Sequence, residues 1–380
     1  MIKKSSSPQR PDEKDGRPSA SRSMTPATDY DRSPMLVFYE LTRACDLVCL
    51  HCRACAQSQR DPGELGTDQA KRLIDQLSEF PELPMLVLTG GDPFKREDLF
   101  ELIEYATNRG LSVSITPSAT PLVTAEAVKR LASLGVSRLA ISMDGADANT
   151  HDAHRGVRGS FAHSLRILEG ARESGLRTQV NTTMLPQNLG QIAGLADVCE
   201  SVGIDLWSVF FLVPVGRANQ APRLSPAQYE QAFACLYAES LHRPFLIKST
   251  EAPHYRRYVL QQWREKKREL GAVSPLPPFA RSGINDGRGV LFVGHDGKIL
   301  PSGFLPLTCG VFPRDNVVQV YQESPIFLAL RDPKQLLGKC GVCQFRKICG
   351  GSRARSFAVT GDFLAAEPDC LYQPTEEMET

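Results

Sequence analysis

Short apolar runs alternate with amphipathic segments from residue 35 onward. The runs are rich in β-branched residues and read as buried throughout, which is typical of parallel strands, whereas the segments between them have helical periodicity. We predict strands at 35–41, 85–89, 111–116, 136–143, 176–182 and 204–213, and helices at 68–79, 97–109, 125–134, 161–173 and 189–202. Six such units indicate an α/β fold but fall short of a closed eight-stranded barrel. We therefore expect a partial (β/α)6 TIM-type barrel over residues 34–225.

The alternation stops after about residue 225. Residues 226–289 read as a helical bridging segment and linker, with a charged helix at 255–270. Residues 290–374 read as a small Cys-rich α+β module, which begins with a β-hairpin turning at Asp296-Gly297. The chain is thus expected to carry a second, smaller domain after the barrel.

Composition narrows the function classes. The net charge of +1 gives no electrostatic reason to expect nucleic acid or an anionic membrane as a partner. No apolar run reaches the roughly 18–20 residues of a membrane span, and no apolar segment follows the basic N-terminus, so we expect a cytoplasmic protein. Residues 1–33 are polar and are expected to be a disordered tail, and residues 375–380 a second tail.

Three cysteines directly follow the first predicted strand, at Cys45, Cys49 and Cys52. Clustered thiols in a protein without an export signal indicate metal ligands rather than disulfides. An iron–sulfur cluster normally takes four Cys ligands, so three would leave one iron open, as in a catalytic metal site. A zinc site or chance clustering is the alternative.

Four further cysteines, Cys340, Cys343, Cys349 and Cys370, lie near the C-terminus. Four thiols fully ligate a cluster and leave no exchangeable position, which favours electron transfer or a structural role. A zinc ion with four Cys ligands is the alternative.

The spacing Cys-x3-Cys-x2-Cys after a strand resembles the motif of the radical S-adenosylmethionine (SAM) superfamily, and the similarity extends over about residues 35–373. This resemblance implies that Cys45, Cys49 and Cys52 hold a 4Fe–4S cluster and that SAM chelates the open iron. One electron would then cleave SAM to methionine and a 5′-deoxyadenosyl radical, which abstracts hydrogen from the substrate. A low-potential electron donor such as flavodoxin or ferredoxin is implied as a partner.

Further motifs that resemble the family follow in strand order. Thr89-Gly90-Gly91-Asp92-Pro93 is similar to the loop that holds the SAM amino group, with Asp in place of the usual Glu. Paired glycines also allow a ligand to approach the backbone closely. Arg155 resembles the arginine that pairs with the SAM carboxylate, for which a guanidinium is suited. The SAM contacts that the resemblance implies are Gly90, Gly91, Asp92, Pro93, Ser118, Ser142, Asp144, Arg155, Asn181, Val213 and Pro214.

The C-terminal module resembles the SPASM domain of peptide-modifying radical SAM enzymes. A complete module holds two auxiliary clusters, but two expected Cys positions are Ser302 and Arg353, and Cys309 alone could not hold a cluster. The resemblance therefore implies one auxiliary 4Fe–4S cluster, on Cys340, Cys343, Cys349 and Cys370. Among the remaining thiols, Cys199 and Cys235 are expected in the core, and Cys55 is either a substitute ligand or a buried bystander.

The segment 350–370 is most similar to radical SAM enzymes of alternative heme and d-type heme synthesis, which implies a tetrapyrrole substrate. Those enzymes modify propionate side chains, with which Arg256 and Arg257 could pair, although charged helices usually face solvent. Two alternatives stay open. One is a maturase of a ribosomally made peptide, and the other is a non-catalytic iron–sulfur or zinc protein used as a sensor or scaffold.

Overall fold

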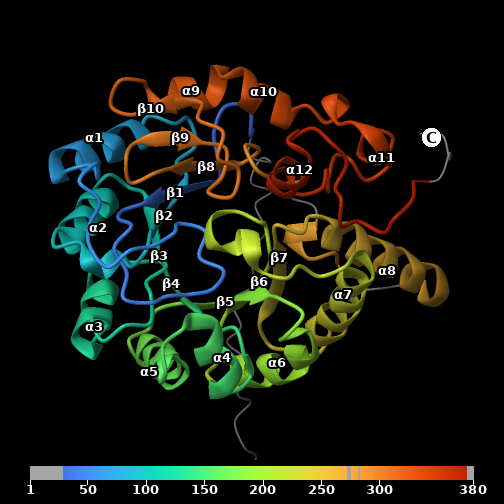
Figure 1. Cartoon of the computed structure of the whole chain (residues 1–380), viewed down its shortest axis with the longest axis horizontal. Coiled ribbons are helices and arrows are strands. Elements are labelled where there is room, and N and C mark those ends of the chain that lie inside the picture. Colours follow the sequence, from blue (N-terminus) through green and yellow to red (C-terminus); the bar gives the residue numbers. More distant parts are fainter. Residues whose placement is uncertain (1–28, 272–274, 281–282, 375–380) are drawn as a thin grey trace, which may run out of the picture.

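The computed structural model describes residues 29–271, 275–280 and 283–374. In this part of the chain ten strands form one sheet, in the order β10-β9-β8-β1-β2-β3-β4-β5-β6-β7 (Figure 1). The strands are β1 Leu36–Glu40, β2 Met85–Thr89, β3 Ser112–Ile115, β4 Arg138–Ser142, β5 Thr178–Met184, β6 Leu206–Phe211, β7 Leu246–Thr250, β8 Val290–Val293, β9 Lys298–Leu300 and β10 Gly310–Val311. Strands β8 and β1 to β7 pair in parallel, and β9 and β10 pair antiparallel. Among the described residues β7 and β10 are the two edges, so the sheet is an open, partial barrel, as predicted.

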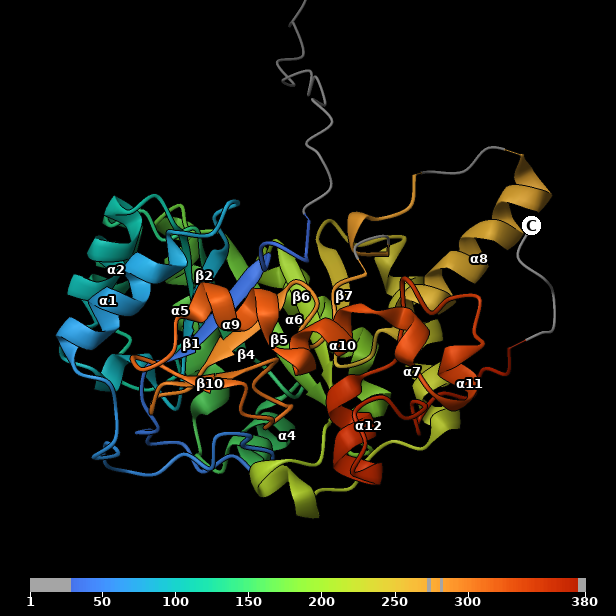
Figure 2. The same cartoon turned by 90° about the horizontal axis from the view of Figure 1, so that it is seen from above.

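Helices follow the strands and cover the outer side of the curved sheet (Figures 1 and 2). Those between β1 and β8 are α1 Thr67–Leu77, α2 Leu99–Asn108, α3 Ala125–Ser133, α4 Ala148–Arg155, α5 Ser160–Glu173, α6 Ile192–Ser201, α7 Pro226–Ser240 and α8 His254–Leu270. The C-terminal helices are α9 Val317–Glu323, α10 Pro325–Arg331, α11 Gly338–Gly341 and α12 Arg353–Thr360. The main core lies between sheet and helices.

Side chains alternate along each strand because successive residues point to opposite faces. In β1 Val37 and Tyr39 are fully buried beneath the helices, whereas Leu36 and Phe38 face the inside of the barrel. The same alternation runs through β5, TQVNTTM, whose inward residues are only partly buried. In β1 and β5, therefore, one face is only partly buried, whereas burial on both faces was expected; β6 is buried at all but one position.

The structure differs from the predicted elements at three places. Strand β7 lies within the segment 226–289, where only helices and a linker were expected, and β7 continues the parallel sheet beyond β6. Helix α4 was not predicted, because ANTHDAHR lacks an apolar stripe; it begins at an Asp147 N-cap. Residues 29–33 of the expected disordered tail pack on the protein, with Ser33 fully buried. Residues 1–28 and 375–380 lie outside the described residues.

The C-terminal segment is joined directly to the barrel sheet. Strand β8 pairs in parallel with β1 and forms an antiparallel hairpin with β9, which confirms the predicted hairpin around Gly297. Helices α9 to α12 follow at this end of the molecule (Figure 1). The boundary expected at residue 290 therefore falls within one continuous sheet.

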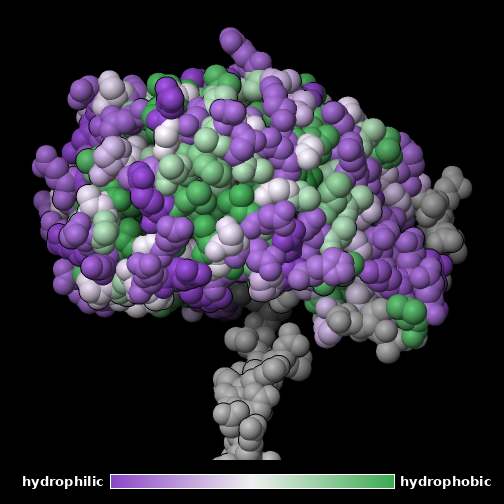
Figure 3. All heavy atoms as spheres, turned by 90° about the horizontal axis from the view of Figure 1, so that it is seen from below, coloured by the Kyte–Doolittle hydropathy of each residue, from purple (hydrophilic) through white to green (hydrophobic). Residues whose placement is uncertain are grey.

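The outer face that carries α3, α5 and α6 has mixed polarity. Figure 3 shows hydrophilic residues along its edges and hydrophobic residues gathered near its middle. No helix in the described part of the chain has the length and apolar character that a membrane crossing requires.

Candidate functional site

A cavity of about 610 Å³ occupies the concave side of the sheet. Inward-facing residues of β1 to β8 line it, together with the three-thiol loop, which we define as residues 45–52. The loop follows the carboxyl end of β1, the edge at which parallel α/β barrels carry their chemistry. Cys45, Cys49 and Cys52 all contribute to the cavity lining.

The thiols of this loop pack against one another, and each has a hydrogen-bond donor. The Leu47 amide donates to Cys45 Sγ over 3.3 Å, and the Ala56 amide donates to Cys52 Sγ over 3.4 Å. An Arg155 guanidinium nitrogen lies 3.7 Å from Cys49 Sγ. Donors aimed at sulfur stabilise thiolates and tune iron–sulfur clusters, so this set fits a cluster with three protein ligands.

The paired glycines after β2 let two backbone segments approach each other. The Gly91 amide donates to the Thr42 carbonyl over 2.7 Å, and the Asp92 amide donates to the Ala44 carbonyl over the same distance. A Cβ atom on Gly91 would lie 2.4 Å from the Ala44 oxygen, and one on Gly90, where φ is +152°, would lie 2.4 Å from the Thr42 oxygen. The glycines thus hold the segment that leads into the three-thiol loop, in addition to lining the cavity.

The acidic residue of this motif is fully buried and satisfied internally. Asp92 accepts hydrogen bonds from Thr120 Oγ1 over 2.7 Å and from the Phe94 amide over 3.1 Å. The Ser118 hydroxyl bridges the Gly91 carbonyl, at 2.9 Å, and Cys45 Sγ, at 3.2 Å. Ser118 therefore links the ends of β2 and β3 to the first thiol.

A buried ion pair lies beside the second thiol. Arg155 Nη2 is 2.5 Å from Asp144 Oδ2, and His51 Nε2 is 3.8 Å from the same oxygen. Burial alone would raise the pKa of Asp144, but Arg155 and the two nearby histidines, His51 and His151, lower it to about 2. Burial lowers the pKa of His51 to about 4. Arg155 therefore stays charged and connects the end of β4 to Cys49.

The expected SAM contacts divide into two groups by position. Those that line the cavity are Gly90, Gly91, Ser118, Ser142, Arg155, Asn181 and Val213. Those outside its lining are Asp92, Pro93, Asp144 and Pro214. Asp92 and Asp144 support the cavity wall through hydrogen bonds and an ion pair rather than facing the cavity.

The cavity has two chemically different walls. The wall formed by β8, β1 and β2 is apolar and consists of Val290, Phe292, Leu36, Phe38, Met85 and Val87. The wall formed by β4 to β7 is mainly polar: besides Ala140, Phe210 and Phe211, it includes Arg138, Ser142, Gln179, Asn181, Ser208 and Lys248. Such a cavity suits a ligand with a broad apolar body and a polar or charged edge.

Two residues at β7 were missed by the sequence reading, since β7 itself was missed. Lys248 lines the polar wall, and Glu251 follows the carboxyl end of the strand with φ of +58°. A non-glycine residue in this left-handed region is strained and is often found at a functional site. Burial raises the pKa of Glu251 well above its usual range, and a hydrogen bond to the Asp286 carboxyl group adds to the rise. Glu251 therefore keeps its proton to a higher pH than an exposed carboxyl group does.

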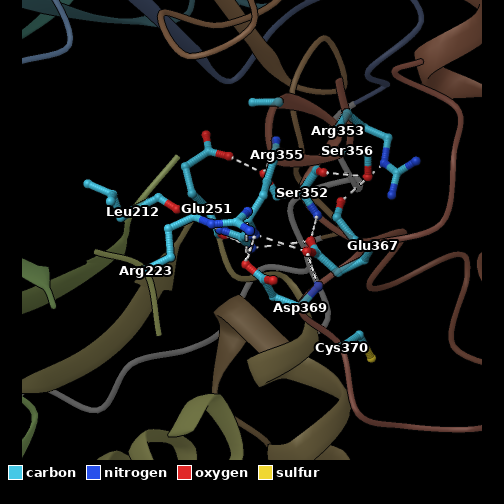
Figure 4. Close-up of polar contacts among 12 residues, drawn as sticks. Leu212, Arg223, Glu251, Ser352, Arg353, Arg355, Ser356, Glu367, Asp369 and Cys370 are labelled. Carbon is cyan, nitrogen blue, oxygen red and sulfur yellow. Dashed lines mark hydrogen bonds and ion pairs between the residues drawn. The ribbon is translucent and has the colours of Figure 1, made fainter. Parts of the chain in front are cut away.

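A buried polar network connects the cavity wall with the second cysteine set (Figure 4). Arg355 donates to the Leu212 carbonyl over 3.3 Å and to the Glu251 carbonyl over 2.6 Å. Its Nε also donates to Glu367 Oε1 over 2.9 Å. The Glu367 amide lies 3.3 Å from Cys340 Sγ. A continuous chain of contacts therefore runs from the cavity to Cys340.

The four C-terminal cysteines surround one small cavity of about 20 Å³. Besides Glu367, the Phe345 and Gly351 amides donate to sulfur, each over 3.4 Å, to Cys343 and Cys349. Cations line the same cavity: Arg257, Lys339 and Arg346. Thiolates among amide donors and cations suit an anionic four-Cys cluster. Within the described residues, no three His, Cys, Asp or Glu side chains are spaced as ligands of one metal ion.

The other cysteines differ in part from expectation. Cys199 is fully buried in the core, as predicted, but Cys235 is exposed on α7, so the core prediction for it was wrong. Cys55 is exposed rather than buried, with φ of +47°. Cys309 is half-buried, and its thiol lies 3.5 Å from the Leu307 carbonyl.

The positions that lack an expected thiol have other partners. Arg353 is buried and donates to the Phe363 and Ala365 carbonyls, and Ser302 lines the main cavity. The paired arginines of α8 face different surroundings: Arg256 lines the main cavity, whereas Arg257 pairs with Glu230 beside the second cysteine set. The first turn of α8 is therefore buried rather than solvated.

Comparison with known proteins agrees with this geometry. The family model described as "Radical SAM superfamily" matches residues 39–199, which contain the three-thiol loop, the glycine pair and Arg155. Over 342 residues the chain is 39% identical to an AdoMet-dependent heme synthase of Methanosarcina barkeri, covering 90% of this chain and 97% of the relative. Over 359 residues it is 40% identical to an AdoMet-dependent heme synthase of Nitratidesulfovibrio vulgaris, covering 92% and 96%.

A solved structure shows the same fold at lower sequence similarity. Streptococcus suis SuiB bound to its precursor peptide SuiA superposes with a TM-score of 0.68 at 18% identity, covering 90% of this chain and 76% of SuiB. The overall fold is thus shared at low sequence identity.

Proposed function

This chain belongs to the radical SAM superfamily, and on that premise we propose that it modifies a propionate side chain of a tetrapyrrole. The observation that carries the proposal is the two-walled cavity beside the three-thiol loop. A tetrapyrrole has a flat apolar ring and carboxylate side chains, which match the apolar wall of β8, β1 and β2 and the polar wall of β4 to β7. The two heme synthases, which align over nine-tenths of the chain, support the same substrate class.

The cofactor assignment follows from the two thiol sets. Cys45, Cys49 and Cys52 would hold a 4Fe–4S cluster with one open iron, and the cavity beside them would take SAM. When bound and reduced, such a cluster supplies the electron that cleaves SAM and generates the radical that removes a hydrogen atom from the substrate. Gly90 and Gly91 keep the loop in place, and Arg155 holds positive charge at Cys49.

The second thiol set would hold one auxiliary 4Fe–4S cluster on Cys340, Cys343, Cys349 and Cys370. Desaturation of a propionate to an acrylate requires loss of one hydrogen atom, one further electron and one proton. A cluster held by these four thiols would supply an acceptor for that electron, and the network through Arg355 joins its pocket to the cavity wall. A low-potential protein such as flavodoxin or ferredoxin is the proposed external reductant, in the cytoplasm.

A peptide substrate is the second candidate, since the fold is shared with SuiB, which binds the precursor peptide SuiA. At 18% identity that likeness shows the fold alone. The heme synthases are about twice as similar in sequence, so the tetrapyrrole is the better supported substrate.

The proposal is tested with anaerobically reconstituted protein, SAM, dithionite and a porphyrin that carries propionates. We expect 5′-deoxyadenosine and an altered porphyrin side chain, detected together by mass spectrometry. Formation of 5′-deoxyadenosine with the porphyrin recovered unchanged, in both free-base and iron-loaded forms, would contradict the proposed substrate.

A further inference from the structure

Three cationic side chains face the main cavity from the polar side. Lys248 lies on β7, Arg138 is the first residue of β4, and Arg256 lies in the first turn of α8. In the described part of the chain the Lys248 ammonium group has no hydrogen bond or ion pair. Arg138 donates to Gln179 Oε1 over 3.4 Å, and Arg256 donates to two backbone carbonyls, so neither guanidinium is paired with a carboxylate.

Other cations at the cavity are neutralised, which sets these three apart. Arg155 is paired with Asp144, and Arg53 is paired with Glu40 over 2.8 Å. Two carboxyl groups also line the cavity, but Glu251 accepts a hydrogen bond from Ser352 Oγ and Asp286 accepts one from the Ala354 amide, and burial raises the pKa of Glu251 well above its usual range.

The charge at Lys248 is also destabilised by its surroundings. The pKa of Lys248 is lowered to about 8, mainly by burial and to a smaller extent by the positive charges of Arg138 and Arg256. When a cation has cationic neighbours and no counter-charge, binding of an anion stabilises its charged form. Among the described residues, the three cations of the polar wall thus have no carboxylate paired with them.

Strand register places Lys248 in line with the expected cofactor contacts. Ser142 of β4 is paired with Asn181 of β5, Asn181 with Ser208 of β6, and Ser208 with Lys248 of β7. These residues form one inward-facing row, with Ser142 at one end and Lys248 at the other. A ligand anchored at Lys248 would therefore lie next to SAM bound at Ser142 and Asn181.

We propose that Lys248, flanked by Arg138 and Arg256, forms a carboxylate-binding subsite that anchors substrate propionates. This inference rests on the proposed function and adds to it a specific anchor and an orientation. The carboxylate edge of the ring would lie on β7, and the ring would lie against the apolar wall.

The test compares the binding of two ligands to the reconstituted full-length protein. One is a free-base porphyrin with propionate side chains, and the other is its methyl ester, each titrated anaerobically by absorbance and fluorescence. In the wild-type protein the acid should bind more tightly than the ester. Lys248→Met should weaken binding of the acid roughly tenfold or more, as expected for a lost charge-assisted contact, and leave the ester unaffected. Lys248→Arg should restore most of the affinity for the acid.

Lys129→Met is the matched control, because Lys129 is exposed on α3, away from the cavity. Iron content and thermal unfolding report whether each variant is folded, and Arg138→Met provides a second variant of the same wall. Equal weakening of acid and ester by Lys248→Met, or no weakening of either, would overturn the subsite. If the wild-type protein binds acid and ester equally, the subsite fails while the tetrapyrrole proposal stands. If it binds neither, the tetrapyrrole proposal itself fails.

Discussion

Substitution of Gly91 by Ala tests whether the glycine pair supports the three-thiol loop. A Cβ atom there would lie 2.4 Å from the Ala44 carbonyl oxygen and 2.7 Å from the Arg43 oxygen, and neither backbone atom can move aside without shifting the loop. The shift would break the backbone hydrogen bonds from Gly91 to Thr42 and from Asp92 to Ala44. Two such bonds contribute about 1–3 kcal/mol, at roughly 0.5–1.5 kcal/mol each. Overpacking costs about 1–3 kcal/mol more, so the expected loss in free energy of unfolding is about 2–6 kcal/mol.

The assay is urea unfolding of the apoprotein, followed by iron content after anaerobic reconstitution. Gly91→Ala should lower the unfolding midpoint and the iron bound at the three-thiol loop. The matched control is Gly170→Ala, because Gly170 lies inside α5 with no atom within 4 Å of an added Cβ. That substitution should be neutral or stabilise by about 0.5–1 kcal/mol. Wild-type stability and full iron loading in Gly91→Ala would show that the glycine pair does not support the three-thiol loop.

Three further predictions concern individual side chains. Cys49→Ala should abolish SAM cleavage, whereas Cys343→Ala should retain uncoupled 5′-deoxyadenosine formation but lose product; full turnover in both variants would contradict the assignment of two clusters. Burial would raise the pKa of Glu40, but its arginine and histidine partners lower it to about 2. Wild type should therefore be more stable than Glu40→Gln above about pH 5, and this difference in free energy of unfolding should shrink as the pH falls toward 2. Burial raises the pKa of Glu251 well above 4.5, so Glu251→Gln should match wild-type stability below that pH and exceed it increasingly as the pH rises. A difference in urea unfolding that does not vary with pH would contradict the raised pKa.

The sequence alone allowed prediction of the six βα units and both thiol sets. Strands β1, β2, β4 and β6 contain runs of apolar residues, β3 and β5 alternate between polar and apolar residues, and cysteine spacing is a local signal. Strand β7, LIKST, has only two apolar residues, and Leu246 is exposed at the sheet edge. Its place in the sheet depends on pairing with β6, which is a tertiary contact that local periodicity does not encode.

The roles of individual side chains were less predictable than their motif. The acidic residue after the glycine pair accepts hydrogen bonds from Thr120, and Arg155 pairs with Asp144. Motif spacing places these residues at the correct edge of the sheet. Whether each one contacts a bound ligand or a neighbouring side chain depends on residues that lie far apart in the sequence. Lys248 was missed because the strand that carries it, β7, was not predicted.

We propose that Cys45, Cys49 and Cys52 hold a 4Fe–4S cluster with a coordination position open to SAM. The most direct measurement is electron paramagnetic resonance of the reduced, reconstituted protein before and after SAM is added. We expect one cluster signal to change on SAM addition and this change to be absent in Cys49→Ala. An unchanged spectrum in wild-type protein that has both clusters loaded, or zinc bound at these thiols in anaerobically purified protein, would contradict the account.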